Sequence, residues 1–236
     1  MRQRWEIDEL IESWTLDADD LLLVTNKAGA TRLGFAVLLK FFEMEARFPS
    51  SAEEVPIEVV DFVARQVGVG FDKLSAYDWA GRSWKRHRAQ IRARFGFRGW
   101  SDTDVDRLIE GLITDAAGDI GTREQLLNAA YRWCRTARVE PPVAAKVARY
   151  TGSAVRRWEE LAHATICHRL GAEAVSRLEV LFDPDRRDRL IVLRTDPGAV
   201  SVDTVLGELD KLTVLTSLAV PPSVLDGFNR SVGCPV

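Results

Sequence analysis

The fold class is decided by residues 17–42, which read DADDLLLVTNKAGATRLGFAVLLKFF. Three aspartates crowd the start of an apolar segment, an arrangement that suits the positive end of a helix dipole. The turn signal at residues 26–29 separates this segment from a second run, residues 31–42, that is apolar on most sides. The pattern predicts a helix, a short turn and a second helix. Gly34 costs about 1 kcal/mol inside the second helix, so we expect another backbone to approach it closely.

Helical periodicity continues along the rest of the chain and predicts an all-α fold. Pro56 fits the first position of a helix that Gly68 ends, and a basic helix is predicted from about Trp79 to Phe95. A capping-box variant starts a helix at Ser101. Further helices are predicted at 122–134, at 143–170 with a break at 151–153, and from there to Phe182. A turn is predicted at 183–185, a short strand or one helical turn at 190–193, and a final helix at 201–218.

The chain has 236 residues, of which 46% are hydrophobic, and so forms one large or two small domains at roughly 150 residues per domain. Pro141 and Pro142 coincide with a change in composition and mark the best linker. We therefore expect a first helical domain over residues 1–134, a linker at 135–142 and a second helical domain over residues 143–236.

Composition excludes several classes of protein. No stretch approaches the roughly 18 apolar residues of a membrane span, and residues 1–12 carry four acids and lack the apolar run of a signal peptide. The three cysteines, Cys134, Cys167 and Cys234, lie far apart, which excludes a disulfide framework and a CxxC metal half-site. We expect a reduced, cytoplasmic protein with no membrane partner.

The net charge of −3, from 32 Lys+Arg against 35 Asp+Glu, conceals two basic islands. The first island holds seven cations and no acid: Arg82, Lys85, Arg86, Arg88, Arg92, Arg94 and Arg98. The second island comprises Arg135, Arg138, Lys146, Arg149, Arg156 and Arg157. A polyanion responds to the charged face that it approaches rather than to the average over the chain. The net charge therefore does not exclude a nucleic-acid partner.

The cations of the first island face outward if the segment is a helix, because Trp84, His87, Ile91 and Phe95 then share the opposite, apolar face. Like charges at helical spacing repel, and nothing within the segment offsets that repulsion. Three interpretations remain open, namely a solvated face, acidic neighbours in the fold, or a bound polyanion. His87 is expected to be a packed or backbone-bonded histidine rather than a ligand.

The second island has the spacing of a helix-turn-helix reader of DNA. Residues 151–153, Thr-Gly-Ser, would form the polar turn between two short basic helices. Together, the two islands suggest two DNA-contacting modules in series.

Motifs for catalysis or metal binding are weak. Glu160 and His163 have the Glu-x-x-His spacing of di-iron bundles, with Cys167 and His168 nearby, but such bundles need two of these motifs and the sequence has one. Residues 102–106 open like a calcium loop but lack its glycine and its bidentate glutamate, so we expect them to cap a helix. We predict no catalytic residue, no metal site and no cofactor. A stand-alone metal-dependent enzyme, resting only on these His and Cys residues, is a third alternative.

Three blocks follow one another in a set order: TRLGFAVLL at 31–39, Val55-Pro56 with Gln66-Val67, and Arg86-His87, Ile91 and Gly96-Phe97-Arg98. They resemble the N-terminal region of the large replicative bacterial transposases of the ampicillin-transposon type, the Tn-three family. That region carries an Asn-Arg-Leu-Gly-Phe-Ala-x-Gln-Leu block, a Val-Pro helix ending in Gln-Leu, and an Arg-x-x-His, Ile, Gly-Phe-Arg pattern. Thr31 and Leu38 stand where the family has Asn and Gln.

The resemblance implies an all-helical region that recognises the terminal inverted repeats of a transposon through two successive DNA-binding domains with helix-turn-helix-like elements. The family's catalytic carboxylates lie far downstream, so we expect a DNA-binding part of a transposase that is not an enzyme. Self-association through the missing C-terminal part is a further expectation. The expected partner is double-stranded DNA, and the candidate contacts are Lys27, Arg32, Arg82, Lys85, Arg86, Arg88, Gln90, Arg92, Arg94, Arg98, Lys146, Arg149, Arg156 and Arg157.

Two other functions stay open at this point. One is a helical protein-interaction scaffold, in which the arginines pair with acidic segments such as residues 102–106. The other is a stand-alone regulator of transposition.

Overall fold

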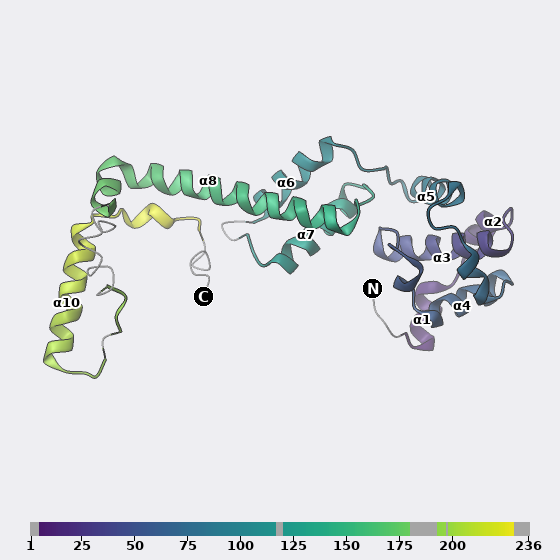
Figure 1. Ribbon diagram of the computed structural model, residues 1–236, viewed down its shortest axis with the longest axis horizontal. Coiled ribbons are helices and arrows are strands. Elements are labelled where there is room, and N and C mark those ends of the chain that lie inside the picture. The colour runs from purple at the N-terminus through teal and green to yellow at the C-terminus, as the bar shows by residue number, and fades with distance from the viewer. Residues whose placement is uncertain (1–4, 117–119, 180–192, 197, 229–236) are drawn as a thin grey trace. The chain divides into compact units, whose positions relative to one another are not determined.

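The computed structural model describes residues 5–116, 120–179, 193–196 and 198–228. Within these ranges the chain forms helices and no strand, so the all-α prediction is confirmed (Figure 1). None of the helices in the described part is both long enough and apolar enough to cross a membrane. The chain divides into two compact units, Met1–Gly111 with Arg123–Thr151, and Leu112–Thr122 with Gly152–Val236.

The first unit begins with a helical bundle whose central member is α3. The bundle consists of α1 (Ile7–Trp14), α2 (Ala18–Val24), α3 (Gly29–Glu45), the 3-10 helix η1 (Ala52–Glu54), α4 (Ile57–Val67), the 3-10 helix η2 (Phe71–Ala76) and α5 (Arg82–Phe95). Helix α3 contacts α1, α2, α4, α5 and η2. Every residue of α3 from Leu33 to Phe42 is buried, which explains why the sequence is apolar on most sides there.

The predicted helix, turn and helix over residues 17–42 are α2, the turn at 25–28 and α3. Asp17 caps α2, and its side chain accepts a hydrogen bond from the backbone N–H of Asp20 at 2.7 Å. The Asp20 carboxylate lies 3.8 Å from the ammonium of Lys40, which is buried in α3. The Glu43 carboxylate lies closer to the same ammonium, at 2.5 Å, so Lys40 has two counter-charges, of which Asp20 joins α2 to α3.

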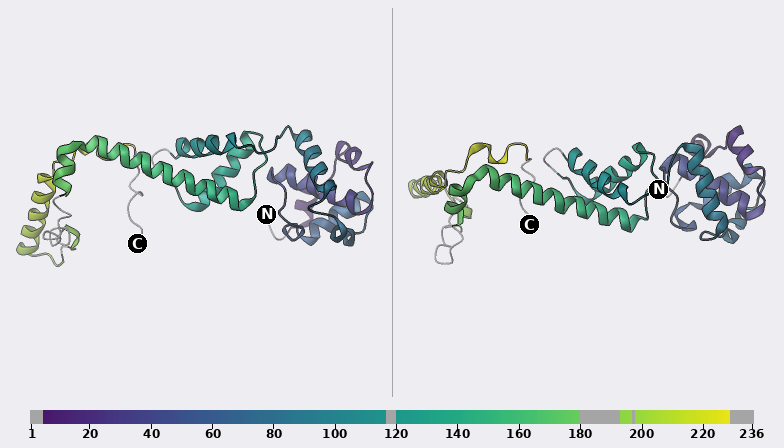
Figure 2. Two further views of the ribbon diagram at one scale, coloured as in Figure 1. Left: turned by 45° about the horizontal axis from the view of Figure 1, so that its top comes forward. Right: turned by 90° about the horizontal axis from the view of Figure 1, so that it is seen from above.

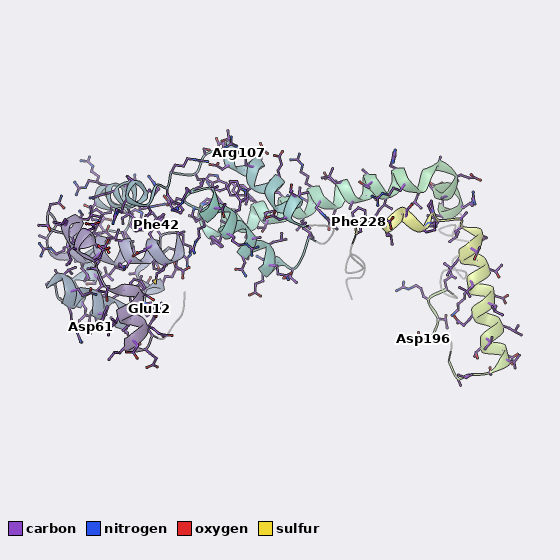
Figure 3. The ribbon with its side chains drawn as sticks, turned by 180° about the vertical axis from the view of Figure 1, so that it is seen from behind. Glu12, Phe42, Asp61, Arg107, Asp196 and Phe228 are labelled. Carbon is purple, nitrogen blue, oxygen red and sulfur yellow. The ribbon has the colours of Figure 1, made fainter. Side chains whose placement is uncertain are left out.

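Aromatic rings fix α5 against α3. Phe42 belongs to α3 (labelled in Figure 3). Its ring stacks on Phe95 with 5.8 Å between the ring centres, and it meets Phe97 edge-on at 5.0 Å. The C-terminal end of the basic helix is therefore anchored to the core of the bundle.

The expectation of a close neighbour at Gly34 is correct, but its identity is not. A Cβ atom added at Gly34 would lie 2.4 Å from the ring of Tyr77, so the neighbour is a side chain and not another backbone. Tyr77 is buried directly after η2. The absence of a side chain at Gly34 is what lets this ring lie against α3.

Three further helices follow the bundle, namely α6 (Thr103–Asp115), α7 (Arg123–Thr136) and α8 (Ala144–Glu179). The carboxylate of Asp104 accepts a hydrogen bond from the backbone N–H of Ser101 at 2.8 Å, which is the helix start predicted there. Trp100 stacks on Tyr150, with 5.7 Å between the ring centres, and meets Trp133 edge-on at 6.4 Å. Within the first unit these rings hold α7 and the first turns of α8 together.

The predicted break at residues 151–153 is wrong, because α8 continues through them (Figure 2). Gly152 disfavours a helix by about 1 kcal/mol. Val147, Thr151 and Ala154 lie four and three residues apart and are buried, so packing of this face outweighs the local preference. The backbone leaves helical geometry at Gly171 instead, with φ 72° and ψ 161°. The helix-turn-helix predicted at the second island therefore does not form.

The second unit contains the rest of α8, α10 (Val202–Ser217) and the 3-10 helix η5 (Pro222–Leu225). Helix α10 confirms the helix predicted at 201–218, and Trp158 on α8 meets Phe228 edge-on at 6.1 Å. Residues 180–192 lie outside the described part of the chain. Three predictions fall in this range: the helix end at Phe182, the turn at 183–185, and the element at 190–193 except for Leu193.

The predicted linker at residues 135–142 lies within the first unit. Val139 and Glu140 are buried, and Val139 forms an isolated parallel β-bridge with Arg98. The division of the chain at this linker stays a prediction.

Candidate nucleic-acid interface

The basic helix α5 has well-defined ends. Oδ1 of Asp78 accepts hydrogen bonds from the backbone N–H groups of Ala80 at 3.1 Å and Gly81 at 2.9 Å, which turns the chain into the helix. Gly96 adopts the left-handed conformation, with φ 69°, and ends the helix. The first turn contains no acid and starts at Arg82, so cations lie at the positive end of the helix dipole.

The apolar face predicted for α5 is the face that the fold buries. His87 and Ile91 are buried, and Trp84 and Phe95 are half-buried. This side of α5 packs into the hydrophobic core of the bundle, so the orientation of the helix is fixed by its apolar residues.

His87 is a packed histidine, as predicted. Its Nδ1 lies 2.7 Å from the Tyr77 hydroxyl, and its ring meets Phe35 edge-on at 5.0 Å. Burial lowers the pKa of His87 from 6.5 to about 4, and the positive charges of Lys27 and Arg86 act in the same direction. His87 is therefore neutral at pH 7 and adds no charge to the interface.

One buried acid pairs with two cations of the first island. The carboxylate of Glu140 pairs with Arg88 through Oε1 and with Arg92 through Oε2. Glu140 lies in the segment between α7 and α8, so a distant part of the chain neutralises this flank of α5.

The C-terminal cations of the first island also have partners. Arg98 donates two hydrogen bonds to the carboxylate of Asp104, at 2.6 and 2.7 Å, and this pair holds the pKa of Asp104 well below its usual range. Arg94 lies 3.4 Å from the exposed carboxylate of Asp19. Gln90, another of the predicted DNA contacts, is half-buried.

The remaining cations of α5, Arg82, Lys85 and Arg86, form what we call the free stripe. Lys85 and Arg86 follow Arg82 by three and four residues, which places all three on one side of the helix. All three side chains are exposed. None of the three side chains makes a hydrogen bond or ion pair with the residues that the structure describes. The exposed small residues Ala89 and Ala93 continue the same face toward the end of α5.

Lys27 and Arg32 hold the turn before α3. The Lys27 ammonium donates to the carbonyl of Leu23 at 2.6 Å and to Oδ1 of Asn26 at 3.0 Å, and it lies 3.9 Å from the centre of the Phe35 ring. Burial lowers the pKa of Lys27. Nε of Arg32 donates to the Lys27 carbonyl at 2.7 Å. These bonds are local and structural, and a DNA contact by either residue stays a prediction.

The four predicted contacts on α8 are all exposed: Lys146, Arg149, Arg156 and Arg157. The Arg149 guanidinium lies 5.2 Å from the centre of the Tyr150 ring, and Arg156 donates to Oγ of Ser153 at 3.1 Å. Because α8 is continuous here, these cations follow one another along one helix rather than on two.

Sequence reasoning missed Glu140. It is the one acid among residues 135–142, next to Pro141, and the pattern there indicates a linker. An isolated acid within a basic stretch is the signal that could have identified it as the partner of a second basic segment.

His163 and Cys167 form a close pair on the surface of α8. Sγ of Cys167 lies 3.7 Å from Nε2 of His163, one turn away, and both side chains are exposed. In the part of the chain that the structure describes, no three His, Cys, Asp or Glu side chains are arranged to hold a metal ion.

Residues 2–154 match a protein-family model whose description is "Domain of unknown function (DUF4158)". The match covers more than half of the chain. It contains α1 to α7 and the first turns of α8, so α5 and the free stripe lie within it.

Proposed function

We propose that this chain, which belongs to the DUF4158 family, binds double-stranded DNA at the terminal inverted repeats of a transposon. The DUF4158 domain is found in Tn-three family transposases. In this proposal the chain is an N-terminal part of a transposase, and its residues contribute binding rather than catalysis. The observation that supports the proposal most is the free stripe on α5.

The free stripe needs a partner of opposite charge. Its three cations lie within one turn of each other and at the positive end of the helix dipole, so they repel one another. None of the three forms an ion pair with an acid of the described fold, in contrast to the four other cations of the first island. A row of phosphates supplies the missing negative charge, and the release of counterions makes such contacts favourable. The DNA backbone is therefore the partner that fits this pattern best.

The outward face of α5 also leaves room for a duplex. Ala89 and Ala93 are small and exposed, so no long side chain blocks the second half of this face. His87 and Ile91 anchor the opposite face, so the helix meets DNA as a rigid element. The major groove admits an α-helix. We propose that α5 lies along the duplex with the free stripe on the phosphates, while its paired arginines hold the helix in the fold.

The exposed cations of α8 provide a second set of contacts in this proposal. Lys146, Arg149, Arg156 and Arg157 project from one continuous helix. Such a helix contacts phosphates without the turn that a helix-turn-helix requires. Phosphate contacts position a protein on the duplex and do not read its sequence. We therefore assign these four residues to affinity rather than to recognition of the repeat.

A mobility-shift experiment with the full chain tests the proposal. The two probes are the inverted-repeat ends flanking the encoding gene and an unrelated duplex of equal length. Tighter binding to the repeats is expected, and log affinity should fall with log salt at a slope near −5 if about six phosphates are neutralised. A shallow slope on both probes contradicts the proposal.

A matched pair of variants controls for general charge. Lys85→Gln should weaken binding, whereas Lys73→Gln should not, because Lys73 is an exposed lysine of η2 outside the free stripe and lies 3.5 Å from Asp72. Equal effects of the two changes would show that the position of the charge is irrelevant, which also contradicts the proposal.

The alternative function, a helical protein-interaction scaffold, is favoured by one observation. Arg98 pairs with Asp104, within the acidic segment that this alternative names. A scaffold would show no retardation of either DNA probe by the wild type, and Arg98→Gln would chiefly lower its melting temperature. DNA retardation that disappears on changing the free stripe, with an unchanged melting temperature, rejects the scaffold.

A further inference from the structure

Glu140 is a buried acid whose position is fixed by the backbone. It is 4% exposed, and its backbone N–H donates to the carbonyl of Arg98 at 2.9 Å. The N–H of Arg98 in turn donates to the carbonyl of Arg138 at 2.9 Å, which completes the bridge at Val139. Two segments of backbone therefore hold the Glu140 carboxylate beside α5.

The carboxylate divides its two oxygens between cations on successive turns of α5. Arg88 pairs with one oxygen of Glu140 and Arg92 with the other. One negative charge thus faces two positive charges. Only 33% of the Arg88 side chain and 25% of the Arg92 side chain stay exposed.

The two arginines differ in what else holds them. The Arg88 guanidinium lies 5.1 Å from the centre of the Phe48 ring and 5.2 Å from that of Trp84, so two cation–π contacts retain it. The Arg92 side chain has Glu140 as its one partner among the residues that the structure describes. Within the described part of the chain, Glu140 is therefore the one group that retains Arg92, whereas Arg88 has the two rings as well.

Arg92 lies where it would lengthen the free stripe. It follows Lys85 by seven residues, which is two helical turns on the same side of α5, with the exposed Ala89 between them. Repulsion from Arg88, one turn away, moves Arg92 outward once Glu140 is neutral. A phosphate that contacts Lys85 would then have a further cation two turns along the helix.

We infer that Glu140 limits the affinity of α5 for DNA by holding Arg92 away from the phosphates, an inference that rests on the proposed function. The carboxylate acts in two ways, because it withholds a cation and its own charge repels phosphates. Phosphate contacts carry no sequence information. The restraint therefore applies to any duplex, and its effect is to keep non-specific binding low.

The test measures DNA binding by the full chain with Glu140→Gln over a salt series. One additional phosphate contact steepens the slope of log affinity against log salt by about 0.9, and at 0.1 M salt it tightens binding about eightfold. We expect the same change on the inverted repeats and on an unrelated duplex. Adding Arg92→Gln to Glu140→Gln should return both quantities to their wild-type values.

A second variant keeps the test decisive if Glu140→Gln fails to fold, since that change leaves the half-buried Arg88 without its counter-charge. Arg88→Met with Glu140→Met removes both charges and replaces them with apolar side chains of similar volume. Arg92 loses its partner Glu140 in this variant as well, even without the repulsion from Arg88, so the same steeper slope is expected.

Two results overturn the inference. The first is that the wild type binds DNA but neither variant, Glu140→Gln or the double variant Arg88→Met with Glu140→Met, changes the slope of log affinity against log salt. The other is tighter binding by Glu140→Gln that Arg92→Gln does not reverse. A wild type that binds no duplex even at low salt contradicts the proposed function itself, and the inference falls with it.

Discussion

The Tyr77 hydroxyl lies 2.7 Å from Nδ1 of His87, and this contact ties the segment before α5 to the buried face of α5. The two rings are stacked, with 5.8 Å between their centres and 14° between their planes. Because His87 projects from the basic helix, the pair acts together with the apolar face of α5 to fix the rotation of the helix. That rotation decides which cations reach solvent.

Tyr77→Phe should lower the free energy of unfolding by about 1–3 kcal/mol, because the ring remains while the buried His87 loses its partner. Urea unfolding followed by circular dichroism measures this change. Tyr150→Phe is the control, since the Tyr150 hydroxyl has a partner only at 3.5 Å, on the exposed Arg149. Equal losses in the two variants would mean that the Tyr77 contact has no special role.

Two glycines in helices should respond to alanine with opposite signs. At Gly34 the new Cβ would lie 2.4 Å from the Tyr77 ring, so Gly34→Ala should destabilise the fold by about 1–3 kcal/mol. At Gly152 no atom lies within 4 Å of the new Cβ, so Gly152→Ala should stabilise α8 by up to about 1 kcal/mol. Thermal unfolding of both variants checks the signs. A higher melting temperature for Gly34→Ala would refute the account of this contact.

His87 should make stability depend on pH. Its pKa in the fold is about 4, below the ordinary 6.5, because burial disfavours the charged imidazolium. The stabilisation is fully present above pH 6.5 and is lost as the pH falls from 6.5 toward 4. Between pH 7.5 and 4.5 the free energy of unfolding should therefore drop by about 2–3 kcal/mol. His87→Gln should lack this part of the drop, and identical pH profiles for the two proteins would contradict the assignment.

The cations of α8 should act through phosphates alone. Arg157→Gln should make the salt slope shallower by about 0.9 and weaken binding equally on the inverted repeats and on unrelated DNA. Arg177→Gln is the matched control, because Arg177 lies on α8 beyond the non-helical Gly171, pairs with Glu173 at 2.5 Å and is not among the predicted contacts. A loss confined to the inverted repeats would instead assign Arg157 to sequence reading.

Local patterns in the sequence predict the elements of this fold well. Three kinds of signal act over only a few residues, so their effect is visible in the sequence. They are the aspartates at the start of α2, the glycines that end α4 and α5, and the apolar face of α5. The continuity of α8 was not predictable in this way. Thr151, Gly152 and Ser153 read as a turn, and only the burial of the adjoining face shows why they stay helical.

The charge pairing of the candidate site lies beyond sequence reasoning for a similar reason. Arg92 and Glu140 are 48 residues apart, and nothing local to either residue indicates the other. The sequence shows seven cations without an acid, and the fold divides them into four that are paired and three that are not. That division, rather than the total charge, is what identifies the free stripe.

The salt dependence of DNA binding by a triple variant tests the central claim most directly. The variant carries Arg82→Gln, Lys85→Gln and Arg86→Gln. Its melting temperature should be no lower than that of the wild type, because none of these side chains has a partner in the described fold and their mutual repulsion is removed. If each contacts a phosphate, the slope of log affinity against log salt becomes shallower by about 2.7 on the inverted repeats. An unchanged slope in a folded triple variant would show that the free stripe does not contact DNA.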